Sequence, residues 1–263
     1  MSTNTTSETC KTCSETLQGT YCHKCGEKVV EERDFHFKTL LKETFGGIFN
    51  FDSKIFKSFY YLLLKPGKLT VNYIEGIRTP FMKPIQLFLV INVFFFLLLT
   101  QADILRITAE YYFVDNREID LKEMSQQTGI SEVELRHQFD TDSANYSKAL
   151  VIILIPFFAL ILVLVNFQKR LFYGKHIIFA LHYFSFFLVF CVLLIVINNL
   201  GNKILQLTIV GANFLYLFFA IRIFYQNKFW ISAIKAFITL VLFLSLILTY
   251  REFISNLTFQ LLS

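Results

Sequence analysis

Five long apolar stretches divide the chain, and each has the length that a membrane-spanning helix requires. The first covers residues 84–102 and contains no charged residue. At 1.5 Å per residue it would be about 28 Å long, close to the roughly 30 Å hydrocarbon core of a bilayer. Four further runs follow, at residues 149–166, 177–197, 204–221 and 231–250. This pattern predicts an all-α membrane protein with about five transmembrane helices.

The remaining segments are polar and complete the predicted organisation. We interpret residues 1–34 as a small zinc ribbon and residues 35–83 as amphipathic helices with an elbow at the membrane surface. Residues 103–148 are interpreted as an extracytoplasmic helical loop, because Thr128-Gly129 predicts a helix stop and Ser131 with Glu134 predicts a capping box. The last four spans then lie within residues 149–250, and residues 251–263 form a tail.

The amphipathic helices are predicted from two stripes of apolar residues before the first span. Apolar side chains recur at helical spacing over residues 37–49 and 55–63, with lysines beside the stripe. Helices of this kind are too short to span a bilayer and suit its surface. In the elbow, Arg78 and Lys83 are candidates for contact with lipid headgroups. Packing of these helices on each other or on the bundle is the alternative.

Four of the five cysteines form two pairs that predict a metal site, at Cys10, Cys13, Cys22 and Cys25. Two Cys-x2-Cys pairs can present four thiolates to one tetrahedral ion, which is typical of Zn2+. The short gap between the pairs leaves little room for an apolar core, so the metal would supply the folding energy. An iron centre, free thiols and two disulfides are the alternatives, and a reducing cytoplasm disfavours disulfides. His23 is interpreted as a surface residue, since four cysteines are already available.

Lysine and arginine are distributed unevenly, which predicts the orientation of the chain. Residues 1–83 carry 12 Lys and Arg, whereas residues 103–148 carry 5 against 10 acidic residues. The N-terminus is therefore expected in the cytoplasm and the C-terminus outside. The net charge of +5 follows from this bias. Residues 8–32 contain three lysines and five glutamates, so no nucleic-acid partner is expected for the ribbon.

The apolar residues of this chain are concentrated in the five apolar runs, which contain few polar residues. The chain is 54% apolar, above the roughly 45–50% of globular domains. Asn92 and Asn213 fall near the middle of the first and fourth runs and are predicted to bond with each other. His182 is expected to bond to a neighbouring helix, with a proton relay as the alternative. The catalytic motifs that we compared, including His-Glu-x-x-His and Gly-x-Ser-x-Gly, do not occur, so we favour a protein that is not an enzyme without excluding one.

A group of short motifs resembles a known family. Residues 25–28 read Cys-Gly-Glu-Lys, residues 62–67 read Leu-Leu-Leu-Lys-Pro-Gly, and residues 73–78 read Tyr-Ile-Glu-Gly-Ile-Arg before Pro84. They are similar to an uncharacterised bacterial domain-of-unknown-function family of polytopic inner-membrane proteins with an N-terminal four-cysteine zinc ribbon. The resemblance covers about residues 10–100. It implies a multi-pass protein of the bacterial inner (plasma) membrane and no particular activity.

Two turns also resemble each other, at residues 170–175 and 222–228. They would fit a duplicated helical hairpin, although the positive-inside bias and an aromatic belt can produce such a string twice.

Three classes of function are compared. The favoured one is a scaffold, assembly or regulatory protein whose ribbon docks a protein partner. A transporter or channel for a small or lipidic solute is the alternative, and an intramembrane enzyme is the third. Partner, substrate and oligomeric state do not follow from the sequence.

Overall fold

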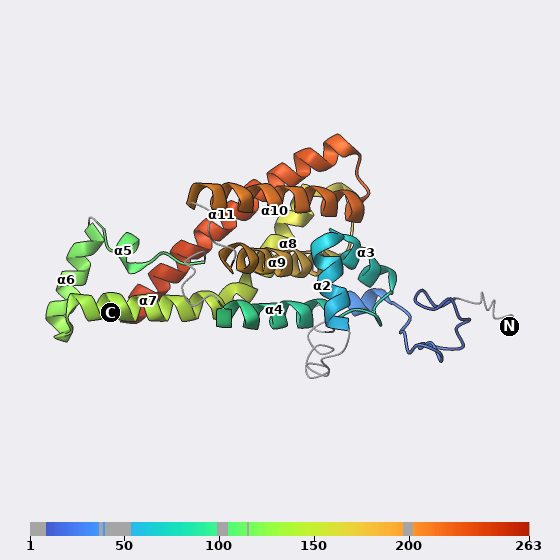
Figure 1. The fold of residues 1–263 in the computed structure, drawn as a ribbon, viewed down its shortest axis with the longest axis horizontal. Helices are drawn as coiled ribbons and strands as arrows, with labels where there is room; N and C mark the ends of the chain where they lie inside the picture. The colour runs from blue at the N-terminus through green and yellow to red at the C-terminus, as the bar shows by residue number, and fades with distance from the viewer. Residues whose placement is uncertain are drawn as a thin grey trace.

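The computed structural model of this chain describes most of its residues. They are residues 9–36, 39, 54–98, 105–114, 116–196 and 202–262. In these residues the regular secondary structure is helical, apart from two isolated β-bridges near the N-terminus. Figure 1 shows a bundle of long helices with the N-terminal segment beyond one end and a group of shorter helices beyond the other. The amphipathic stripe predicted at residues 37–49 lies largely outside the described residues.

Five apolar helices form the bundle, as the hydropathy pattern predicts. They are α4 (Pro84–Leu98), α8 (Leu154–Val165), α9 (Tyr173–Val196), α10 (Asn202–Tyr225) and α11 (Phe229–Leu262). Four helical stretches are long and apolar enough to cross a membrane: Glu132–Val165, Tyr173–Leu193, Leu207–Tyr225 and Phe229–Leu262. The helix α4 has 15 residues, which corresponds to about 22 Å. The described part of the first predicted span is therefore helical but shorter than a bilayer core.

The helix α9 is the centre of the bundle and packs against α4, α8 and α10. In its most apolar 18 residues 78% are buried, compared with 33–39% in the corresponding part of each of the other three candidate spans. Three aromatic rings, from α8, α9 and α11, meet in the core of the bundle. The ring of Phe158 lies 5.0 Å from that of Tyr183 and 5.3 Å from that of Phe243. The outer helices consequently expose most of their apolar surface, as expected for helices surrounded by lipid.

Two helix boundaries differ from the predicted ones. The helix α7 (Glu132–Ala149) continues through the 3-10 turn η2 (Leu150–Ile153) into α8, so the outer loop and the second span share one helical path. Likewise α11 extends to Leu262, and the predicted tail at 251–263 is mostly its last turns. A 34-residue helix is about 51 Å long. The charged residues at these two boundaries show where each helix leaves the apolar region. The helices do not end there, because neither has a glycine or proline at that boundary.

The shorter helices form a helical cap, which we define as residues 105–148 with the last turns of α11. It contains α5 (Ala109–Tyr112), α6 (Asn116–Thr128) and most of α7. The predicted N-cap at Ser131 is confirmed, because its hydroxyl accepts a hydrogen bond from the backbone N–H of Glu134, which is one half of the predicted capping box. Gly129, at φ +71°, provides the predicted stop after α6. The cap has its own core, of Ala109, Tyr112, Phe113, Leu121, Met124, Leu135 and Phe139.

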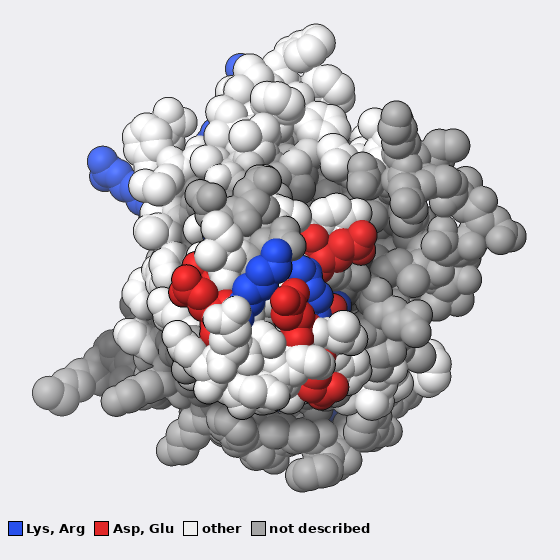
Figure 2. Space-filling model, turned by 90° about the vertical axis from the view of Figure 1, so that its left-hand side faces the viewer, with Lys and Arg blue, Asp and Glu red and all other residues white. Residues whose placement is uncertain are grey.

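Charges on the cap are mixed in sign. Figure 2, which views the molecule from this end, shows Lys and Arg atoms lying among Asp and Glu atoms. Arg106 pairs with Asp140 at 2.5 Å, and Arg117 with Glu252 at 3.8 Å. The acidity of this segment is therefore partly neutralised by ion pairs within the protein.

At the opposite end, two helices lie between the N-terminal module and the bundle. They are α2 (Lys54–Leu64) and α3 (Lys68–Glu75), and α3 occupies part of the predicted elbow. Gly67, at φ +77°, lets the chain turn between them where a Cβ would lie 2.8 Å from the backbone of Ala220 in α10. Leu69 and Tyr73 of α3 are buried in the main core. The elbow is therefore packed on the bundle, whereas α2 leaves Phe56 81% exposed.

The two similar turn strings occupy different structural positions. Arg170 follows α8 after a 3-10 turn and has a positive φ of 45°. Arg222 lies inside the last turn of α10, and the positive φ falls on Gln226. The strings are therefore not equivalent, and their similarity gives no support to a duplicated hairpin.

Candidate metal centre

Two short knuckles, residues 10–14 and 22–26, build the candidate metal site by the same hydrogen bonds. In the first, the backbone N–H of Ser14 donates to the carbonyl of Cys10; in the second, Gly26 donates to Cys22. The residue after each pair has a positive φ, 60° at Ser14 and 72° at Gly26. Glycine is the residue that adopts this conformation without strain. Isolated bridges between Thr9 and Thr16 and between Tyr21 and Lys28 close the knuckles, and together the knuckles constitute the ribbon.

The knuckles bring the four predicted sulfurs together. Their ligand atoms all lie within 4.8 Å of one another. The Cys10 and Cys25 sulfurs are 3.5 Å apart, as are those of Cys13 and Cys22. Four thiolates at about 2.3 Å from a tetrahedral zinc ion would be separated by about 3.8 Å. The four cysteines could therefore hold a metal ion with little movement, whereas His23 is an exposed residue.

Backbone amides stabilise thiolate in the second knuckle. The backbone N–H of Cys25 donates to the Cys22 sulfur and lowers the pKa of that thiol to about 6. At Cys25 a hydrogen bond from the Glu27 backbone acts in the same direction, but burial and the neighbouring thiols outweigh it and raise the pKa to about 12. Thiolate is the form that binds metal. The Cys-x2-Cys turn thus favours the thiolate at Cys22, one of the four thiols that a metal cation would bind.

A buried carboxylate attaches the ribbon to the elbow. Glu27 lies directly after the second knuckle and is only 6% exposed. Its Oε2 accepts hydrogen bonds from the backbone N–H groups of Arg78, at 2.9 Å, and Thr79, at 2.8 Å. The Thr12 hydroxyl in the first knuckle donates to the same oxygen at 2.7 Å. One carboxylate therefore joins both knuckles to the segment that leads into α4.

A second carboxylate, Asp34, repeats this arrangement beside the first. Lys28 donates to it at 2.7 Å, and the Arg78 guanidinium lies 3.5 Å from its other oxygen. Burial by itself would raise the pKa of Asp34, but hydrogen bonds from Lys28 and from the backbone N–H of Glu31, together with the charges of Lys28 and Arg78, outweigh burial and lower it. Arg78 also lies over the ring of Tyr73, 4.5 Å from its centroid. We call the contacts of Glu27 and Asp34 with the elbow the carboxylate dock.

Close backbone approaches complete the dock. The 3-10 turn η1 (Glu32–Phe35) crosses the first turn of α9, where a Cβ on Gly174 would lie 1.8 Å from the carbonyl oxygen of Phe35. Gly76 ends α3 at φ +97°, and a Cβ there would lie 2.8 Å from Val30. Glycine is therefore required at both positions for the ribbon segment to reach the bundle.

The remaining predicted site residues lie apart from the metal centre. Arg78 is committed to the dock and its side chain is 11% exposed, which leaves little of it for the predicted lipid headgroup, whereas Lys83 is half-buried just before α4. The predicted bond between Asn92 and Asn213 is wrong. Asn213 accepts from the Tyr183 hydroxyl at 2.9 Å, and the Asn92 amide donates to the backbone of the cap at Lys148.

His182 bonds to a neighbouring helix, as predicted. Its Nδ1 lies 2.9 Å from the Thr70 hydroxyl of α3. Both side chains are buried, so the bond ties the elbow to the central helix. Its partner was unexpected, because the predicted elbow contained no helix.

Glu27, Asp34 and Gly174 were missed by the sequence interpretation. Glu27 was counted only as one of the charges that argue against a nucleic-acid partner, and Asp34 lies beyond the residues that were counted. Their signal was the acidic residue directly after a metal knuckle, followed about 50 residues later by an elbow with an arginine. This signal predicts contact between a carboxylate and the elbow only when the ribbon and the elbow are already known to lie together.

Comparisons with known proteins give one finding. Residues 52–96 match the model of a family described as "Protein of unknown function (DUF3667)". The match covers α2, α3 and most of α4, and it does not include the cysteines. No curated protein and no solved structure matches the chain.

Proposed function

We propose that this chain is a multi-pass protein of the bacterial inner membrane whose cytoplasmic zinc ribbon docks a protein partner. In this role it scaffolds, assembles or regulates a membrane complex. The observation that carries the proposal is the carboxylate dock. Glu27 bonds to Arg78 and Thr79, which lie shortly before α4, so a partner bound to the ribbon is held at a fixed place beside the bundle.

Zinc is the metal that the donor set supports best. Four thiolates in two Cys-x2-Cys knuckles are typical of structural zinc sites, which contribute directly to folding. The ribbon has almost no apolar core of its own, since Cys10 and Cys22 are its buried apolar residues among positions 9–28. Purified protein should therefore contain one zinc ion per chain. It should lose that ion in the double variant Cys22→Ser plus Cys25→Ser, and protein that lacks zinc, or a variant that keeps it, contradicts the assignment.

The outer surface of the ribbon is available to a partner. Tyr21 is 62% exposed, and His23 and Lys24 beside it are exposed as well. Tyrosine is enriched in protein interfaces because it offers a large rigid surface with a polar end. Tyr21 directly precedes the second knuckle, and His23 and Lys24 lie within it.

The alternative function, transport of a small or lipidic solute, has weaker support. Polar side chains between the helices are used for internal bonds, as His176 with Tyr225 and Tyr183 with Asn213 show. A pathway for a polar solute would need such groups to face water. The apolar groove described in the next subsection is the observation that favours a lipidic solute.

Affinity purification from detergent tests the docking proposal. Wild-type protein should retain a stoichiometric partner that is lost from the Cys22→Ser plus Cys25→Ser variant. The matched control is Arg117→Gln, which removes an exposed ion pair with Glu252 in the helical cap and should leave the partner bound. A partner retained without the cysteines, or no stoichiometric partner with any variant, contradicts docking through the ribbon.

A further inference from the structure

An apolar groove of about 510 Å3 opens between α2, α4 and α9. Its lining consists of Ile55, Phe56, Phe59, Ile91, Phe94, Val189, Val192 and Leu193. Every one of these side chains is a hydrocarbon. Phe56 is 81% exposed, Phe94 49% and Leu193 42%. These three side chains therefore leave apolar surface of the groove uncovered. The volume lies within the range of known small-molecule sites.

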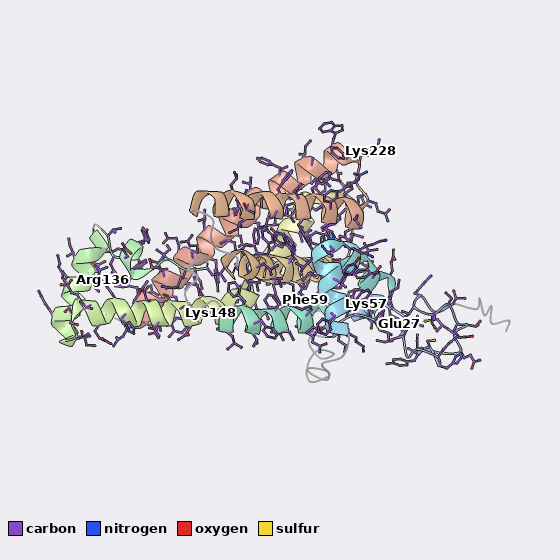
Figure 3. The ribbon with its side chains drawn as sticks, in the orientation of Figure 1. Glu27, Lys57, Phe59, Arg136, Lys148 and Lys228 are labelled. Carbon is purple, nitrogen blue, oxygen red and sulfur yellow. The ribbon has the colours of Figure 1, made fainter. Side chains whose placement is uncertain are left out.

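The helix α2 separates this groove from a basic surface. Ile55, Phe56 and Phe59 share one face of the helix, and Lys57 lies on the other. In Figure 3, Phe59 lies toward α4 and α9, whereas Lys57 lies on the side nearer the ribbon. Figure 1 shows α2 running across the direction of α4 and α9. An amphipathic helix oriented in this way has the geometry of one that lies in a membrane interface.

Lys57 is available for an anionic ligand. Its ammonium lies 5.4 Å from the ring centroid of Phe81, and among the described residues no carboxylate pairs with it. Residues 54–83 contain six Lys or Arg and a single acidic residue, Glu75. This segment is therefore complementary to a negatively charged headgroup.

We propose that the groove holds an acyl chain of an anionic phospholipid, with the phosphate of that lipid at Lys57. A bound water would need two to four polar partners, and an inserted peptide would leave backbone groups without partners. A hydrocarbon chain needs neither. Arg78 is used by the dock, so Lys57 of α2 takes the headgroup role that was predicted for Arg78. The inference rests on the membrane placement proposed above, but not on docking by the ribbon.

Native mass spectrometry of the full chain in mild detergent tests this site. The protein is titrated with phosphatidylglycerol and with phosphatidylcholine of the same chain length. The wild type should prefer phosphatidylglycerol, and Lys57→Gln should reduce that preference about fivefold, the effect of one lysine at an anionic surface. Val192→Phe, which fills the groove, should reduce binding of both lipids at least about fivefold.

Two matched controls separate this site from general contact with lipid. Lys228→Gln removes a lysine from the turn between α10 and α11 (Figure 3), and Leu164→Phe enlarges a side chain of α8 that is 62% exposed. Both should behave as the wild type. Equal binding by Val192→Phe and Leu164→Phe, or an unchanged headgroup preference in Lys57→Gln, overturns the proposal. A wild type that fractionates with membranes but retains neither lipid overturns this inference alone, whereas a soluble chain overturns the membrane placement.

Discussion

At the scale of single residues, Glu27 shows why charge counting misread the ribbon. Its carboxylate contributes to the negative balance of residues 8–32, yet it is buried and accepts three hydrogen bonds. A carboxylate bound by backbone N–H groups stabilises its site through bonds that are stronger than neutral ones. The charge therefore serves the attachment of the ribbon, and a sequence alone does not distinguish such a carboxylate from a solvated one.

Gly174 provides a steric test of the same attachment. Gly174→Ala should lower the free energy of unfolding by about 1–3 kcal/mol, the range for overpacking, because its Cβ would overlap the Phe35 carbonyl. The control is Gly211→Ala in α10, whose Cβ meets nothing within 4 Å and which should be neutral or stabilising. Thermal unfolding in detergent measures both. Equal transition temperatures for the two variants would contradict the packing of η1 on α9.

At the scale of elements, local sequence signals in the polar segments predicted helix ends correctly, whereas the depth of a polar residue within a span did not predict its partner. Ser131 and Glu134 predicted the start of α7 because a capping box is local. Asn92 and Asn213 were paired because they share a similar depth, but depth does not determine which helix faces which. The partner of Asn213 is Tyr183 of α9, a residue that a hydropathy profile treats as part of an apolar run.

A double-mutant cycle tests this helix contact. Tyr183→Phe and Asn213→Leu should show a coupling energy of about 0.6 to 2 kcal/mol in the free energy of unfolding, as measured for hydrogen bonds between membrane helices. The corresponding cycle between Asn92→Leu and Asn213→Leu should give a coupling near zero. A larger coupling in the second cycle would restore the pairing of the first and fourth apolar runs.

At the scale of the whole molecule, hydropathy was enough to predict the all-α class and four stretches that are long and apolar enough to cross a membrane, whereas the described part of the first predicted span is a shorter helix. The four cysteines of the candidate metal site could also be predicted, since their spacing is local. The sequence did not reveal that α7 and α11 continue beyond the apolar region, because charged residues end a hydropathy run without ending a helix. Nor did it show the carboxylate dock, whose partners are 51 and 52 residues apart.

Orientation is a prediction for the whole molecule. A cysteine introduced by Asp120→Cys in the cap should react with a membrane-impermeant maleimide added from outside. A cysteine introduced by Phe172→Cys, between α8 and α9, should react only after permeabilisation, because the ribbon end is expected in the cytoplasm. Wild-type protein is labelled in parallel to measure the reaction of the five native cysteines. The reverse pattern of labelling would mean that the chain is inserted the other way round.

Hydrogen exchange at the backbone amides of Arg78 and Thr79 tests most directly that the metal-bound ribbon is fixed to the elbow. Both amides donate to Glu27, so they should be protected in the zinc-loaded protein. Removing zinc with a chelator should unfold the ribbon and increase their exchange at least about tenfold. Glu27→Gln should weaken protection with zinc still bound, whereas Glu15→Gln should not. Equal exchange of these amides with and without zinc would contradict the account.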